Sequence, residues 1–232
     1  MLGKIILLRH GESIWNQENR FTGWTDVNLT KNGKDEAKKA GILLFHENLN
    51  IGIVFVSYLK RAIKTSKICL KQLDNEKIEE FYDWRLNERH YGSLQGLNKL
   101  ETARKYGDEQ VLAWRRSYDI APPPLLKDDK RHPKYDILYK DIDKRLLPIS
   151  ESLKDTLIRV KPLWLNQILP KIKKGESILV VAHGNSLRAI VKMIKDLSNK
   201  EVLKLNLKCG QICCHLKKLV YSKQVKKKLN HL

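Results

Sequence analysis

The chain has 232 residues, 42% of them hydrophobic, and carries a formal net charge of +19. A chain of this length can bury a large apolar core without disulfide bonds. Since no apolar run approaches about 18 residues, we expect no transmembrane helix. The charge fits an anionic substrate, a nucleic acid or an acidic membrane surface. Because 33 of the 45 basic residues are lysines scattered along helical segments, we favour a solvated lysine-rich surface and do not expect a nucleic-acid partner.

The N-terminus and the cysteines are typical of a cytoplasmic protein. The chain runs directly into a predicted strand and resembles no secretory signal peptide. Its four cysteines, Cys69, Cys209, Cys213 and Cys214, would be free thiols in a reducing compartment. Three of them lie near the C-terminus beside His215, but their spacing matches no zinc signature, so we predict no metal site.

The first predicted element is a strand over residues 4–9 that leads into Arg9-His10-Gly11. Its unbroken apolar run is typical of a central strand of a parallel sheet, and Gly11 permits a sharp turn. A single histidine there would usually be a hydrogen-bonded turn residue, but residues 178–186 repeat the pattern and end in His183-Gly184-Asn185-Ser186. Neighbouring parallel strands end at one sheet edge, where one imidazole could be a nucleophile and the other could stabilise the charge on a transferred group.

Helices and strands alternate between these two strands. Thr30 is the predicted N-cap of a helix that ends near residue 46, and strands are predicted over residues 51–57 and 78–82. Arg61 follows the first of these strands, where a helix begins. We therefore place its guanidinium close to the sheet edge, where it could bind a phosphate in a bidentate manner.

Residues 84–150 are predicted to form an insertion that covers the site. Prolines 122–124 exclude a continuous helix there, and irregular segments of this length in compact domains usually have a function. Helices are predicted over residues 152–169 and 186–197. The N-terminus of the second helix faces the expected sheet edge and would favour an anion.

Longer motifs surround these strand ends. They are Arg9-His10-Gly11-Glu12-Ser13, Trp15-Asn16, the run from Glu18 to Trp24, the run from Leu86 to Gly92, the run from Leu94 to Lys99, and Trp114-Arg115-Arg116. Together they resemble the histidine phosphatase superfamily and, within it, the cofactor-dependent phosphoglycerate mutases, over about residues 3–207. The resemblance implies an α/β fold, a three-layer sandwich with a mostly parallel central sheet flanked by helices, and one catalytic domain over residues 1–207.

The resemblance also implies a role for each motif residue. His10 would be the nucleophile that becomes phosphohistidine, and Glu88 would donate and accept the substrate proton. The transferred phosphoryl group would be surrounded by Arg9, Arg61 and His183. The substrate-binding residues would be Ser13, Asn16, Thr22, Gly23, Arg89, Tyr91, Lys99, Arg115, Arg116, Gly184 and Asn185. No metal ion is expected, because arginine and imidazole would neutralise the phosphoryl charge.

On this basis we predict an isomerase that interconverts 2-phosphoglycerate and 3-phosphoglycerate, with 2,3-bisphosphoglycerate as primer and intermediate. A mutase must exclude water while the bisphosphate turns around, which requires a lid and contacts to the non-reacting end. Lys99, Arg115 and Arg116 would make such contacts, so we favour a mutase over a phosphatase. The expected partners are small phosphorylated three-carbon acids, no membrane is expected, and the resemblance implies a homodimer.

The sequence leaves the family pattern after Leu207. It lacks the Pro-Thr-Gly segment of the family, and residues 204–232 contain eight lysines and no acidic residue. We expect this divergent basic tail, residues 208–232, to add little to the core and to be poorly ordered beyond about residue 221. Two alternatives stay open: a broader histidine phosphatase whose defective lid admits water, and a catalytically weak chain whose tail binds polyanions.

Overall fold

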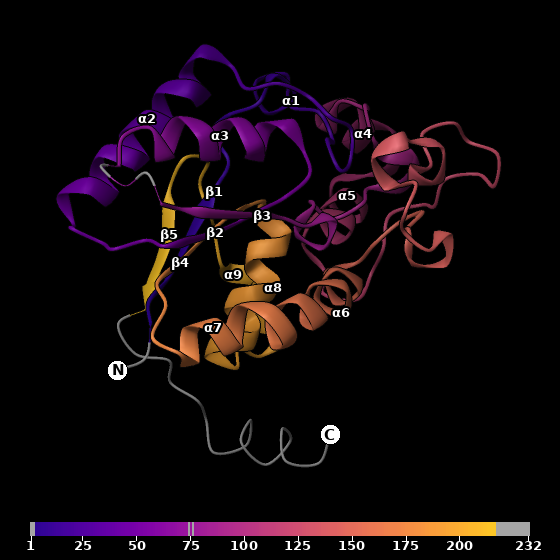
Figure 1. Ribbon diagram of the computed structural model, residues 1–232. Coiled ribbons are helices and arrows are strands. Elements are labelled where there is room, and N and C mark those ends of the chain that lie inside the picture. Colours follow the sequence, from indigo (N-terminus) through magenta and orange to yellow (C-terminus); the bar gives the residue numbers. More distant parts are fainter. Residues whose placement is uncertain (1–2, 74, 76, 217–232) are drawn as a thin grey trace.

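The structure of the protein, a computed structural model, describes residues 3–73, 75 and 77–216. Within this part of the chain five strands form one sheet in the order β3-β2-β4-β1-β5 (Figure 1). They are β1 (Ile5–Arg9), β2 (Ile53–Val56), β3 (Glu79–Tyr82), β4 (Ile178–Ala182) and β5 (Ile212–Leu216). The first four pair in parallel, and β5 pairs antiparallel with β1. The predicted mostly parallel sheet is confirmed.

Helices cover both faces of this sheet, which makes the predicted three-layer sandwich (Figure 1). Successive side chains of a strand point to opposite faces. Ile6 and Leu8 of β1 therefore pack in a cluster with residues of α2 (Lys31–His46) and α3 (Lys60–Leu70). Ile5 and Leu7 belong to the second cluster, which includes residues of the helices between residues 153 and 195. Because both faces are covered, β1 and β4 are apolar at nearly every position.

The helices after residue 150 differ in detail from the predicted ones. The predicted helix over 152–169 is α6 (Leu153–Leu163), the π-type turn η6 (Trp164–Ile168) and α7 (Leu169–Lys173). The wider turn lies between Pro162 and Pro170, neither of which can donate a backbone hydrogen bond. The helix predicted from residue 186 begins two residues earlier, as α8 (Gly184–Lys195), with His183 as its N-cap. It is followed by α9 (Asn199–Lys204).

Residues 84–150 are more helical than expected. Asn98 caps α4 (Lys99–Tyr106) by accepting hydrogen bonds from two backbone N–H groups, and Gly107, with φ of +86°, separates it from α5 (Asp108–Arg116). The remaining elements of this segment are the 3₁₀ turns η1 (Trp84–Leu86), η2 (Gly92–Leu94), η3 (Pro133–Tyr135), η4 (Ile137–Tyr139) and η5 (Lys144–Leu146).

The first part of the divergent tail contributes to the sheet, contrary to expectation. Strand β5 pairs with β1, Ile212 packs against the core, and the backbone N–H of Gly210 donates to the carbonyl of His10 at 3.1 Å. Strand pairing uses backbone groups that every residue here possesses, so an unfamiliar side-chain pattern did not reveal it. The part of the tail predicted to be poorly ordered, beyond residue 221, lies outside the described residues.

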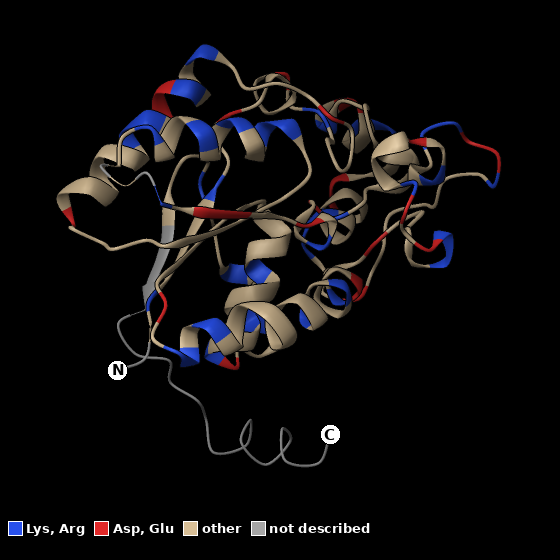
Figure 2. Cartoon of the chain, in the orientation of Figure 1, with Lys and Arg blue, Asp and Glu red and all other residues tan. Residues whose placement is uncertain are grey.

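Lysines and arginines are spread over the helices on both sides of the sheet (Figure 2). This distribution agrees with the predicted solvated surface. No helix among the described residues is both long and apolar enough to cross a membrane.

Candidate active site

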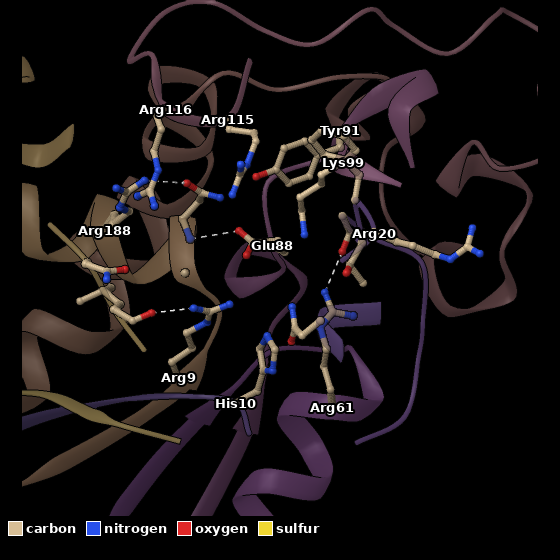
Figure 3. A pocket seen from close by; sticks show the side chains of 18 residues that line it. Arg9, His10, Arg20, Arg61, Glu88, Tyr91, Lys99, Arg115, Arg116 and Arg188 are labelled. Atoms are coloured by element: carbon tan, nitrogen blue, oxygen red, sulfur yellow. Dashed lines mark hydrogen bonds between the residues drawn. The ribbon is translucent and has the colours of Figure 1, made fainter. Parts of the chain in front are cut away.

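The two His-Gly motifs meet where β1 and β4 end. Arg9 is in register with Ala182, so His10 and His183 follow their strands at the same level. Their ring centroids are 4.9 Å apart, and both residues are buried. His10 lines a cavity of about 160 Å³ (Figure 3). His183 is not among the residues that line this cavity. We call Arg9, His10, Arg61 and His183 the floor of the site.

His10 is held in the form that a nucleophile requires. Its Nδ1 lies 2.6 Å from the carbonyl oxygen of Gly11. A carbonyl oxygen only accepts hydrogen bonds, so Nδ1 carries the ring proton and Nε2 keeps a free lone pair. Burial, together with the positive charges of Arg61 and Arg9, holds the pKa of His10 well below its usual 6.5. The ring is therefore neutral near pH 7 and can attack through Nε2.

Arg61 and Arg9 are fixed by backbone carbonyls and keep donors free. Arg61 is 1% exposed and donates to the carbonyls of Gly23 at 2.8 Å and Thr25 at 3.0 Å. Burial lowers its pKa to about 10, so it stays charged at neutral pH. Arg9 donates to the carbonyl of Leu207 at 2.6 Å. The Nε donors of both arginines are buried and have no hydrogen-bond partner among the described residues. Buried free donors next to a nucleophile fit the oxygens of a phosphoryl group.

Glu88 is the acid in the cavity wall, and its carboxylate is held from behind. Oε1 accepts hydrogen bonds from the backbone N–H of Arg89 at 2.8 Å and of Asn185 at 3.0 Å. The Glu88 carbonyl in turn accepts from Trp24 Nε1 at 2.6 Å and from Arg159 at 3.2 Å. Oε2 makes no hydrogen bond within the described part of the chain, which leaves one carboxylate oxygen available for a proton.

Cations and a phenol from residues 84–150 face the floor across Glu88 (Figure 3). We call Tyr91, Lys99, Arg115 and Arg116 the roof of the site. Burial and the neighbouring Arg115 lower the pKa of Lys99 to about 8, and burial and Arg115 lower the pKa of Arg116. The charges of the roof repel one another, and an anionic ligand would relieve this repulsion.

Most of the predicted site residues line the cavity, but three do not: His183, Ser13 and Arg89. Ser13 caps the short helix α1 (Ile14–Gln17) and forms hydrogen bonds with the side chain of Asn16, which does line the cavity. Arg89 is fully buried and donates to the carbonyl of Arg115 at 2.6 Å and to the hydroxyl of Tyr91 at 3.0 Å. Ser13 and Arg89 thus orient residues that line the cavity.

Five lining residues were not in the predicted set: Arg20, Phe21, Arg188, Asn206 and Leu207. Arg188 lies four residues after Gly184 on α8, a spacing that places both on one helix face and could have revealed it. It donates to the carbonyls of Leu205 at 2.9 Å and Leu203 at 3.1 Å. Asn206 and Leu207 carry no sequence signal. The guanidinium of Arg20 points away from the cavity and pairs with Glu18 (Figure 3).

No group of three or more histidine, cysteine, aspartate or glutamate side chains suited to a metal ion occurs within the described part of the chain.

Comparison with known proteins gives the family. The model of the histidine phosphatase superfamily (branch 1) matches residues 5–228. Over 203 residues the chain is 58% identical to a 2,3-bisphosphoglycerate-dependent phosphoglycerate mutase of Parabacteroides distasonis. The aligned region covers 88% of this chain and 82% of the relative. Over 204 residues it is 57% identical to the enzyme of the same name from Bacteroides fragilis, with the same coverage of each chain.

Solved structures show the same fold at lower identity. A mycobacterial glucosyl-3-phosphoglycerate phosphatase aligns with a TM-score of 0.68 and 22% sequence identity, covering 88% of this chain and 86% of the other. A protein titled Bacillus stearothermophilus YhfR aligns with a TM-score of 0.65 and 24% identity, covering 90% and 87%. Both share the three-layer architecture described above.

Proposed function

Because the chain belongs to the histidine phosphatase superfamily and, within it, to the 2,3-bisphosphoglycerate-dependent phosphoglycerate mutases, we propose that it interconverts 2-phosphoglycerate and 3-phosphoglycerate through phosphohistidine at His10. The observation that carries this proposal is the buried, neutral imidazole of His10, with Nε2 free, between two arginines that keep unpaired Nε donors. Such a group can accept a phosphoryl group and return it without a metal ion.

The residues present fit a bisphosphorylated three-carbon acid. Arg9 and Arg61 would hold the phosphoryl group that reacts, and Lys99, Arg115 and Arg116 would hold the second phosphate and the carboxylate. When bound, 2,3-bisphosphoglycerate supplies the phosphoryl group that first charges His10. A homodimer and a cytoplasmic location stay predictions.

Glu88 would move the proton of the substrate hydroxyl. Its free Oε2 would take that proton as the hydroxyl attacks phosphohistidine, and would return it when the substrate phosphate is transferred to His10. The roof would keep the intermediate in place and exclude water while it turns around.

The decisive assay measures conversion of 3-phosphoglycerate by dephosphorylated protein, with and without added 2,3-bisphosphoglycerate. We expect activity only after priming, and one acid-labile phosphate on the wild type but none on His10→Ala by intact-mass analysis. Activity of His10→Ala should fall by at least about a thousandfold, because among the described residues no other imidazole lines the cavity. Equal phosphate uptake by the two proteins would refute the proposal.

A phosphatase is the second candidate, because the sequence departs from the mutase pattern after Leu207 and Gly210 of the divergent segment contacts His10. It predicts release of inorganic phosphate from 2,3-bisphosphoglycerate faster than isomerisation, which the same samples can report. The third candidate, a weak enzyme whose basic tail binds polyanions, predicts salt-dependent binding to random DNA.

A further inference from the structure

The two histidines of the repeated motif have different hydrogen-bond partners. Nδ1 of His10 donates to the Gly11 carbonyl, as described above. His183 instead uses its other nitrogen, Nε2, which lies 2.8 Å from the hydroxyl oxygen of Ser57, the residue that follows β2. Ser57 is fully buried and does not line the cavity. The motif itself therefore cannot explain the partner of His183, since Ser57 comes from a different strand.

The direction of this hydrogen bond follows from Asn87. The backbone N–H of Tyr58 donates to one atom of the Asn87 amide at 3.2 Å, so that atom is the oxygen, Oδ1. The Ser57 hydroxyl lies 2.8 Å from the same oxygen and must donate its only proton to it. Ser57 Oγ can then only accept from His183, and it also accepts from the backbone N–H of Leu59. Hence the proton of the neutral His183 ring is on Nε2.

We propose that Ser57, oriented by Asn87, is a positioning residue that holds His183 in the Nε2–H tautomer, opposite to the Nδ1–H tautomer of His10. The hydrogen bond made by one ring nitrogen decides the protonation of the other. With its Nε2 lone pair blocked by a proton, His183 cannot act as a second nucleophile through that nitrogen. His183 Nδ1 then carries the lone pair and has no hydrogen-bond partner within the described part of the chain. Two identical His-Gly motifs thus carry their ring protons on different nitrogens because their neighbours differ. The role assigned to His10 rests on the proposed function, whereas the tautomer of His183 does not.

The hydrogen-bonded chain continues into the segment that carries the roof. Asn87 Nδ2 donates to the hydroxyl of Tyr139 at 2.9 Å. Tyr139 is buried, and its ring packs 5.1 Å from that of Trp24, whose Nε1 holds the Glu88 carbonyl. Burial raises the pKa of Tyr139, so its phenol stays protonated and neutral. The residues that fix the amide of Asn87 therefore come from both sides of the site.

Nuclear magnetic resonance tests the tautomer directly. Long-range ¹H–¹⁵N spectra of protein labelled with ¹⁵N-histidine distinguish Nδ1–H from Nε2–H rings, and His10→Gln and His183→Gln variants assign the two sets of signals. In the wild type at pH 7.5 we expect Nδ1–H for His10 and Nε2–H for His183. In Ser57→Ala we expect His183 to lose the pure Nε2–H pattern, while His10 keeps its own.

Kinetics and matched variants separate positioning from folding. Ser57→Ala should lower kcat about 10- to 100-fold with little change in KM, because the ring is misoriented after substrate binds. Ser57→Thr keeps the hydroxyl and should restore both the spectrum and most of the activity. Ser66→Ala is the control, because Ser66 is equally buried and its hydroxyl has no hydrogen-bond partner among the described residues.

Two outcomes would overturn the proposal. One is an unchanged Nε2–H pattern for His183 in Ser57→Ala, whatever happens to activity. The other is an Nδ1–H ring for His183 in the wild type. The spectra need no substrate, so they decide the tautomer even if the assay of the proposed function fails. If Ser57→Ala does not fold, Tyr139→Phe with the same spectra replaces it, because that variant loosens Asn87 while Ser57 stays in place.

Discussion

The floor and the roof of the site are both positively charged, but they are anchored differently. In the floor, Arg9 and Arg61 donate to backbone carbonyls, and His10 to its own turn. In the roof, the guanidinium groups of Arg115 and Arg116 make no hydrogen bond within the described part of the chain. The side chains of the floor are therefore already held in place for phosphoryl transfer. The guanidinium groups of the roof become fixed only when they bind an anion.

Arg61→Lys should have the largest effect, because it alters the anchored side. Lysine keeps the charge but cannot donate to Gly23, Thr25 and a phosphoryl group at once from a planar fork. We expect turnover to fall about 10- to 1000-fold, or about 1.4 to 4 kcal/mol of transition-state stabilisation. Steady-state kinetics measure this, with the exposed Arg104→Lys as control. Full activity of Arg61→Lys would mean that the floor needs only diffuse charge.

Arg116→Met should act mainly on binding, since the roof holds the non-reacting end of the ligand. We expect KM for 3-phosphoglycerate to rise about 10- to 100-fold, with a smaller change in kcat. Methionine keeps much of the apolar stem, so the packing of α5 should survive. Arg104→Met on α4 provides the matched loss of an exposed cation. A fall in kcat at constant KM would show that Arg116 acts on the phosphoryl-transfer step, as the floor residues do, and not on substrate binding.

The dependence of the free energy of unfolding on pH reports on buried histidines in the floor and next to the roof. Burial and then Arg159 lower the pKa of His90, next to the roof, to about 3, and the pKa values of His10 and His183 are also lowered. Below about pH 6.5 the unfolded chain therefore binds protons that the folded chain refuses, and the free energy of unfolding falls as pH falls. Each such histidine contributes up to about 1.4 kcal/mol per pH unit.

His90→Asn keeps an acceptor for the Gly92 N–H and removes one of these groups. Urea unfolding at several pH values should then show a shallower loss of stability between pH 6.5 and 5, with the same slope as the wild type above pH 7.5. If the loss of stability between pH 6.5 and 5 is the same as in the wild type, His90 takes up its proton as readily in the folded state as in the unfolded state.

The smallest expected effect concerns the segment that adjoins the floor from the C-terminal side. Gly210 contacts His10 through the backbone, and Cys209 lies beside Asn16 at the cavity. Replacing residues 208–232 with a family-like C-terminus should lower the ratio of phosphatase to mutase activity a few-fold, because less water would reach phosphohistidine. An unchanged ratio would show that the tail does not affect water exclusion.

The sequence by itself determined most of the floor. A single apolar strand that ends in histidine and glycine carries little information, but this pattern occurs twice, and Arg61 follows a third predicted strand. Parallel pairing brings the ends of such strands to one edge of the sheet. For this reason His10, His183 and Arg61 could be placed before the structure was known. The roof residues came instead from the resemblance, because two arginines in an exposed-looking helix carry little information of their own.

Only the tertiary structure decided how these side chains are protonated and held. The opposite tautomers of His10 and His183 depend on Gly11 and on Ser57, and nothing in the shared motif distinguishes them. The strand β5 comes from a segment whose side chains follow no family pattern, and the carbonyl that holds Arg9 belongs to Leu207, the residue just before that segment. Backbone groups make these contacts, and since every residue has them, their partners are set by the path of the folded chain and not by its side chains.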